Sequence, residues 1–116
     1  MNGRLKSLKE AVIVLASGAA AQLEHLRKLG LPGGIDELAL EYDAIAAAAD
    51  DMLRCGELDK NQYGSVKELD NLLSKMSSKA DASLWTAEAL VATPEWKEVR
   101  NLAKECLRLL EVNGNQ

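Results

Sequence analysis

The chain has 116 residues, which suits a single domain with one hydrophobic core. Its 20 Leu and 17 Ala are strong helix formers and its β-branched residues are too scattered for strands, so we expect an all-helical fold. The net charge is −4, and residues 30–58 hold seven acids against one base. Proteins that bind duplex nucleic acid usually carry a concentrated basic surface, so this balance argues against a nucleic-acid ligand.

The first predicted helix spans residues 3–29 and contains the uncharged run AVIVLASGAAAQL. A basic start and small residues are also features of a signal peptide, but the apolar centre is short and Glu10 adjoins it. Apolar residues continue in helical phase through the supposed cleavage point after Ala21: Leu5, Leu8, Val12, Leu15, Ala19, Leu23 and Leu26. A membrane span needs about 20 apolar residues, and this run is too short to be one. We therefore expect a core helix of a cytoplasmic protein without a membrane partner.

The middle of this helix is apolar on nearly every side, because Ile13, Val14, Ala20 and Ala21 lie outside the main stripe. Two explanations remain open: a second layer of the bundle covers these residues, or a partner does. Of the two, we expect an interior helix that is buried on both sides.

The next two helices are predicted from their end signals. Gly30 suits the left-handed position after the first helix, and Gly56 should end a second helix over residues 35–55. The third helix, ending near residue 77, should begin with Asp59 as its cap and Gln62 returning the hydrogen bond.

The start of the third helix also resembles a calcium-binding loop, DKNQYGSVKELD. An EF-hand loop needs oxygen ligands at positions where this segment has Tyr63 and Lys67, and Asp70 replaces the bidentate Glu. The same residues satisfy a helix start and cannot be loop and helix at once. We expect a helix and no calcium.

A polar break at residues 77–83 precedes a short helix over residues 86–92, with Thr86 as its cap. Thr93 as cap and Pro94 at the first helical position then begin a last helix that ends at residues 113–114. Short connections favour antiparallel neighbours. The prediction is an antiparallel bundle of four long helices plus one short helix, within one domain over residues 1–116.

Residues with catalytic potential are few. His25 is the only histidine and has no partner at helical spacing, so we expect an ordinary edge or surface residue. Cys55 and Cys106 form no C-x-x-C pair, and Cys106 lies on an apolar helix face, which suits reduced structural thiols. Asp50 and Asp51 diverge by about 100° on a helix and do not share a metal or a proton by themselves. We expect no enzyme, no metal and no cofactor.

The outer face of the second helix is the candidate binding surface. Asp36, Asp43 and Asp50 fall within about 40° of one another, opposite the apolar stripe. An ordinary solvated face has a similar pattern, but here apolar residues separate the acids and Arg54 is the only base. Such a ridge would attract a basic protein surface. The predicted partner-binding residues are Asp36, Glu37, Leu40, Asp43, Ala47, Asp50 and Asp51.

The chain resembles the small acidic helical immunity proteins that bacteria encode beside contact-dependent and other polymorphic toxins. The likeness lies in its size and in the segments DELALEYDAIAAAADD and WTAEALVATPEWKEVRNLAKECL. The resemblance implies a protein that binds one cognate toxin, such as a basic nuclease, and blocks its active site. These proteins share no diagnostic motif, so the predicted site rests on charge alone.

An alternative hypothesis is a structural or regulatory module that self-associates through Ile13, Val14 and the adjoining alanines, giving a weak homodimer rather than a monomer. Trp85 also has two interpretations. It lies at the rim of the binding face, or it fills the gap between the short helix and the bundle, and we expect the second.

Overall fold

The computed structural model describes residues 3–78 and 82–114. These residues form seven α-helices and one 3₁₀ helix: α1 (Gly3–Ala16), α2 (Ala19–Lys28), α3 (Asp36–Ala46), α4 (Ala49–Arg54), α5 (Lys60–Ser78), η1 (Ala82–Trp85), α6 (Ala87–Ala92) and α7 (Pro94–Gly114). The residues described within the polar break expected at 77–83 belong to α5 and η1; residues 79–81 lie outside the described part.

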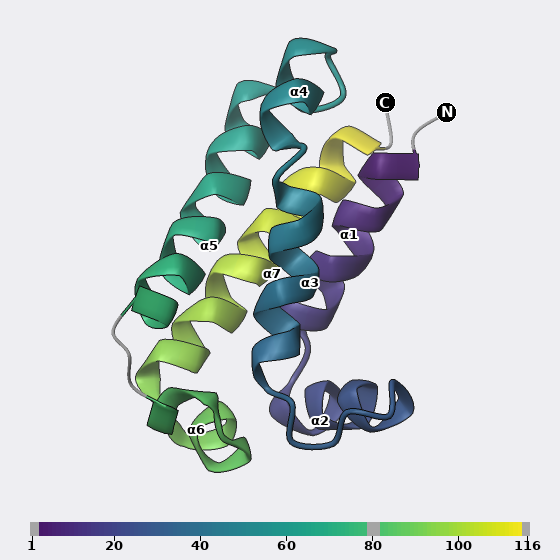
Figure 1. Ribbon diagram of the computed structural model, residues 1–116. Helices are drawn as coiled ribbons and strands as arrows, with labels where there is room; N and C mark the ends of the chain where they lie inside the picture. The colour runs from purple at the N-terminus through teal and green to yellow at the C-terminus, as the bar shows by residue number, and fades with distance from the viewer. Residues whose placement is uncertain (1–2, 79–81, 115–116) are drawn as a thin grey trace.

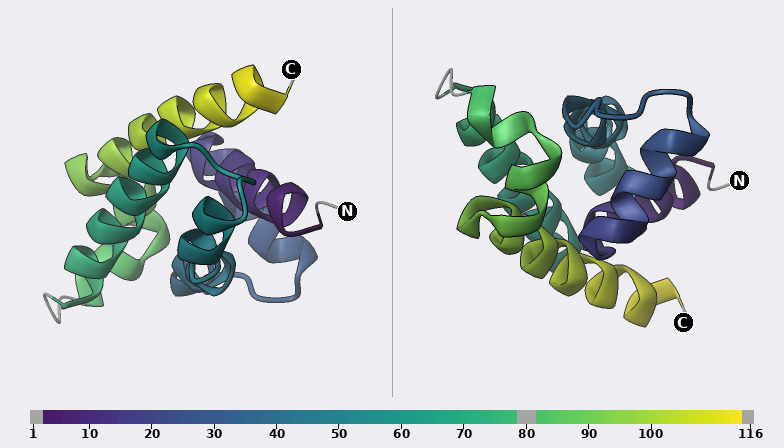
Figure 2. Two further views of the ribbon diagram at one scale, coloured as in Figure 1. Left: turned by 90° about the horizontal axis from the view of Figure 1, so that it is seen from above. Right: turned by 90° about the horizontal axis from the view of Figure 1, so that it is seen from below.

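Four of these helices form an up-and-down bundle, which confirms the predicted all-helical fold. Helix α1 packs against α7 and α3, and α5 packs against the same two helices. Each neighbour runs antiparallel to the next (Figure 1), and the view along the bundle places α3 diagonally opposite α7 (Figure 2). The outer side of α3 therefore faces away from α7.

The prediction of one continuous helix over residues 3–29 is wrong, because the helix breaks at Ser17 and Gly18. Gly18 has an extended backbone (φ −66°, ψ 161°), and α2 turns across the end of the bundle (Figure 1). The break leaves the carbonyls of Val14 and Leu15 without their usual helical donors. The Gln22 side-chain amide donates to both, at 3.1 Å each, and is fully buried.

The expectation that the middle of the first helix is buried on both sides is also wrong. Val14 is half-buried against the core, whereas Ile13 is 46% exposed and Ala20 and Ala21 are exposed. The bend explains this result, since α2 no longer continues along the bundle and only Ala19 of its three alanines packs against the core.

The second predicted helix, over residues 35–55, is likewise divided into α3 and α4. At the junction the amide of Ala48 donates to the carbonyl of Ile45, only three residues back, at 3.1 Å. This tighter hydrogen bond interrupts the regular α-helical pattern. The run of alanines there provides no side chain to hold a particular geometry, so the sequence contains no marker of the break.

The predicted helix ends are confirmed where a side chain or a glycine defines them. Gly30 has φ 78° and Gly56 has φ 80°, each just after a helix. Asp59 and Gln62 exchange hydrogen bonds of 2.7 and 2.8 Å, so the residues of the calcium-like segment begin α5. Thr86 and Thr93 accept from the amides three residues ahead.

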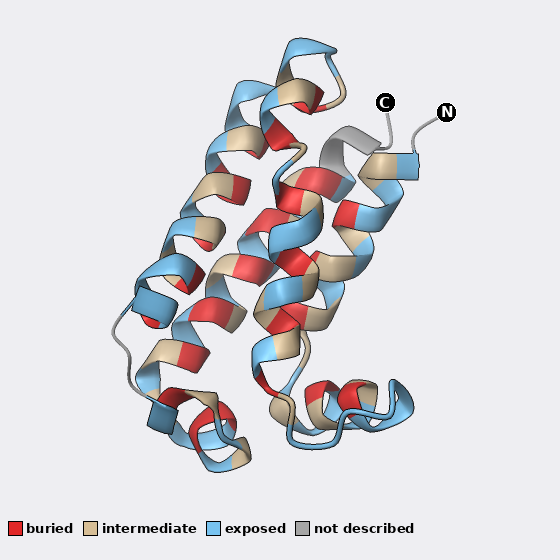
Figure 3. Cartoon of the chain, viewed as in Figure 1, coloured by how far each residue is buried: buried red, intermediate tan, exposed pale blue. Residues whose placement is uncertain are grey.

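Trp96, in the first turn of α7, is fully buried in the core, which runs along the inner sides of the bundle helices (Figure 3). Its indole N–H donates to the carbonyl of Leu84 at 2.7 Å, and its ring meets Trp85 edge to face at 5.5 Å. Trp85, the last residue of η1, thus packs against Trp96 of α7 at the edge of the core, whereas we expected it between the short helix and the bundle. Cys106 is buried and free, also as expected. Within the described residues, none of the helices is both long and apolar enough to span a membrane.

Candidate functional site

The outer face of α3 holds the most exposed part of the predicted binding surface. Asp36 and Asp43 are exposed, and Leu40 between them is 55% exposed. Among the described residues, neither aspartate has an ion pair or a side-chain hydrogen bond. A large apolar side chain therefore stands in water between two unpaired carboxylates, and we call Asp36, Leu40 and Asp43 the α3 face.

Two adjoining depressions lie beside the α3 face, between α3 and α5 and toward η1. Their volumes are about 360 and 370 Å³, and they share Ala39, Leu40 and Ser77. The first is also lined by Asp43, Asp70, Leu73, Ser74 and Ser78, and the second by Asp36, Ala82 and Trp85. Together they form one groove, the α3–α5 groove, with an apolar floor, carboxylates at its edges and no described Lys or Arg in its lining.

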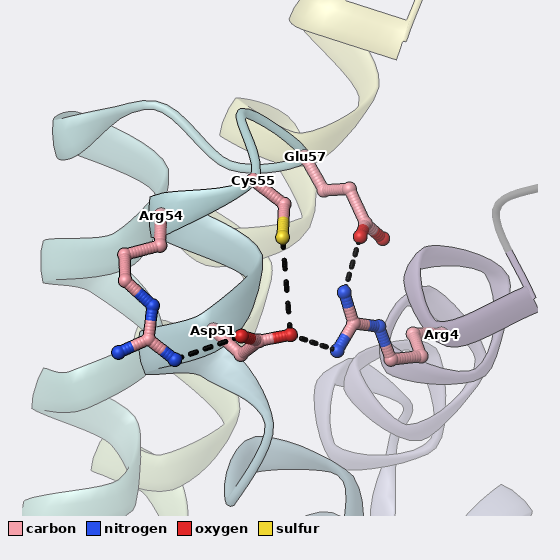
Figure 4. Close-up of polar contacts among 5 residues, drawn as sticks. All are labelled: Arg4, Asp51, Arg54, Cys55 and Glu57. Carbon is pink, nitrogen blue, oxygen red and sulfur yellow. Dashed lines mark hydrogen bonds and ion pairs between the residues drawn. The ribbon is translucent and has the colours of Figure 1, made fainter.

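The predicted acidic strip is not continuous, because the acids on α4 have partners. Asp51 accepts a hydrogen bond from Arg54 at 2.8 Å and another from Arg4 of α1 at 2.7 Å (Figure 4). Arg4 also pairs with Glu57, and the Cys55 thiol lies 3.9 Å from Asp51. The Arg54 and Arg4 guanidinium groups lower the pKa of Asp51 to about 2. The expectation that Arg54 is the only neutralising base is therefore wrong.

The remaining predicted residues are also distributed unevenly. Asp50 is exposed and accepts a hydrogen bond of 2.5 Å from the Tyr63 hydroxyl, which raises the pKa of Tyr63. Ala47 is exposed at the junction between α3 and α4. Glu37 is half-buried in the first turn of α3, where the positive end of the helix dipole stabilises its carboxylate. These three residues do not extend the groove.

His25 has a partner that sequence analysis missed. Its Nε2 lies 3.0 Å from a carboxylate oxygen of Glu41, so the pair links α2 to α3 across 16 residues of sequence. The pair borders a depression of about 270 Å³ that Ser7 and Glu10 also line. Because the bend at Gly18 brings α2 onto α3, no helical spacing indicates this contact.

Several residues that line the α3–α5 groove were not among the predicted partner-binding residues, because only the tertiary fold brings them to α3. Asp70, Leu73, Ser74 and Ser77 belong to α5, which reaches α3 only through the tertiary fold. Trp85 does line the groove while it packs on Trp96, so its two interpretations are compatible.

Neither a metal site nor similarity to a known protein assigns a role to the α3 face. Within the described residues, no three or more His, Cys, Asp or Glu side chains gather in a way that could hold a metal ion. The groove offers apolar contact and negative charge, which are means of binding. Comparison of the chain with protein-family models, with curated proteins and with solved structures gives no match.

Proposed function

We propose that this chain is a non-catalytic binding protein that docks a basic protein surface on the α3 face. Because the sequence resembles small acidic helical immunity proteins, the role we propose is that of an immunity protein, which neutralises a cognate toxin such as a nuclease. The observation that carries the proposal is Leu40, 55% exposed between two aspartates without ion pairs. Leu40 offers apolar contact and the two aspartates offer complementary charge, which together suit a basic protein surface.

The chemistry of this face favours a basic partner. Asp36 and Asp43 face solvent without a neutralising base among the described residues, so a Lys or Arg brought to them forms new ion pairs instead of displacing old ones. Complementary charge also accelerates association and disfavours acidic competitors. Asp51 contributes less, because Arg4 and Arg54 already occupy its carboxylate. We therefore restrict the predicted binding surface to its α3 half.

The test is to mix the protein with the product of any toxin-like gene that adjoins its own and to measure affinity at several salt concentrations. We expect a complex that weakens as salt screens the charges. The double variant Asp36→Lys, Asp43→Lys should bind roughly tenfold more weakly or worse, because tenfold equals about 1.4 kcal/mol and like charges brought together cost more.

The matched control is Glu98→Lys, Glu111→Lys, which makes the same charge change at exposed sites on α7, diagonally across the bundle from α3. This control should bind as the wild type does. If no complex forms with the toxin, the inhibitor role is wrong. If the α3 variant binds with unchanged affinity and salt dependence, the chosen face is wrong.

Self-association is the second candidate function, and the exposure of Ile13 favours it. Ile13 is 46% exposed on α1, and the alanines at 20 and 21 are exposed on α2. A homodimer would cover this apolar area. Light scattering over a hundredfold range of concentration, repeated with Ile13→Lys, distinguishes the functions: a dimer that this substitution dissociates supports self-association, and a monomer throughout excludes it.

A further inference from the structure

We infer that the α3–α5 groove receives one amphipathic α-helix of the partner, carrying two basic residues seven positions apart and an apolar anchor between them. This inference rests on the proposed function and names the element of the partner that binds. The groove supplies three observations that lead to it: the spacing of its carboxylates, the small residues along its second wall, and its two helical walls, whose central backbone groups bond within each helix.

The spacing of the carboxylates matches a helix. Asp36 and Asp43 are seven residues apart on α3, which corresponds to about 10.5 Å along the axis and to nearly the same direction. A partner helix with Lys or Arg at positions i and i+7 repeats this spacing, because both helices have the same rise per residue. An apolar residue at i+3 or i+4 then faces the same side as the bases and meets Leu40.

The second wall of the groove allows a helix to approach closely. Ser74, Ser77 and Ser78 on α5 are exposed and short, so no long side chain of theirs obstructs the groove. Asp70 adds a third carboxylate to the lining, although Lys67 lies 4.0 Å from it. The floor presents the apolar surfaces of Ala39 and Leu73, with Trp85 at the η1 end. An apolar anchor fits this floor while the bases reach the edges.

Other ways of occupying the groove fit less well. An added β-strand needs free backbone donors and acceptors, but the groove runs between helices whose central backbone groups bond within each helix. A phosphate chain would meet the carboxylates of Asp36, Asp43 and Asp70 without a described base in the lining. A basic helix satisfies both the charge and the apolar floor.

The experiment uses two fluorescently labelled synthetic helical peptides of identical composition. One has Lys at i and i+7 with Leu at i+3 and i+4, and the other has both lysines moved to the side opposite the leucines. Anisotropy measures binding to the wild type, to Asp36→Lys, Asp43→Lys and to the control Glu98→Lys, Glu111→Lys. The fluorescence of Trp85, assigned with a Trp85→Phe variant, reports directly whether the groove is occupied.

We expect the matched peptide to bind the wild type and the control alike, to change Trp85 fluorescence, and to bind at least tenfold more weakly to the α3 variant. The rearranged peptide should also bind at least tenfold more weakly. Absent binding, equal binding of the two peptides, or unchanged binding to the α3 variant overturns the inference. If the peptides do not bind but toxin binding still requires Asp36 and Asp43, only the inference that a helix of the partner occupies the groove is wrong. If the toxin itself fails to bind, the proposed function is wrong.

Discussion

Replacing Gln22 by Leu should destabilise the fold by removing the donor that holds the bend between α1 and α2. Gln22 is fully buried, and its amide nitrogen lies 3.1 Å from the carbonyl oxygens of Val14 and Leu15. Its side-chain oxygen lies 3.4 Å from a guanidinium nitrogen of Arg100 on α7. Leu has a similar size, so the substitution deletes these hydrogen bonds with little change in packing volume.

The expected cost follows from the groups that lose a partner. The Val14 carbonyl retains the amide of Ser17 at 3.2 Å, and Arg100 retains the carbonyl of Leu90 at 2.8 Å. Leu15 is only 1% exposed, and no described contact gives its carbonyl a second donor. A buried acceptor left unpaired costs about 1–3 kcal/mol, so we expect a loss of about 2 kcal/mol in the free energy of unfolding.

Chemical and thermal unfolding followed by circular dichroism measure this loss. For a domain of this size, about 2 kcal/mol corresponds to a decrease of roughly 8 °C in Tm. Ala21→Leu is the control, because it adds an apolar side chain at an exposed position of α2 and removes no hydrogen bond. If Gln22→Leu is as stable as the wild type, the hydrogen bonds of Gln22 do not stabilise the bend, and this prediction is wrong.

Two further predictions concern ionisable groups. Arg54 and Arg4 lower the pKa of Asp51, so its stabilising effect is present above the ordinary carboxyl pKa near 3.8 and is lost as pH falls toward about 2. Asp51→Asn should lower Tm at pH 7 and reduce the decrease in Tm between pH 5 and pH 2; an unchanged acid profile would contradict this assignment. Cys55 is exposed, whereas burial raises the pKa of Cys106 to about 11, so a thiol reagent should modify one cysteine in the native protein and two after unfolding. Rapid native modification of Cys106 would contradict its burial.

The helix ends show how far local sequence determines this structure. Asp59 and Gln62 cap α5 through contacts three residues apart, and Gly30 adopts the positive φ that ends α2. Both features depend only on neighbours in the chain, so the sequence contains all the information needed. The breaks at Gly18 and Ala48 differ, because the apolar spacing continues in phase through the first and the second is a run of alanines.

The candidate site divides in the same way. The positions of Asp36, Leu40 and Asp43 on one exposed side of α3 follow from the helical period. The pairing of Asp51 with Arg4, 47 residues away, does not, because it requires α1 to lie beside α4. The sequence accordingly predicted that Asp36, Leu40 and Asp43 are exposed together, and it missed the ion pair between Asp51 and Arg4.

Composition, periodicity and local capping residues determined that this chain is helical, where the capped helices begin or end, and which side of each faces the core, because these properties depend on residues within a few turns of one another. The bend held by Gln22, the neutralisation of Asp51 and the groove between α3 and α5 were decided by the tertiary structure. The packed bundle brings Arg100 of α7 to Gln22, Arg4 of α1 to Asp51, and α5 to α3, and each of these contacts joins residues far apart in sequence.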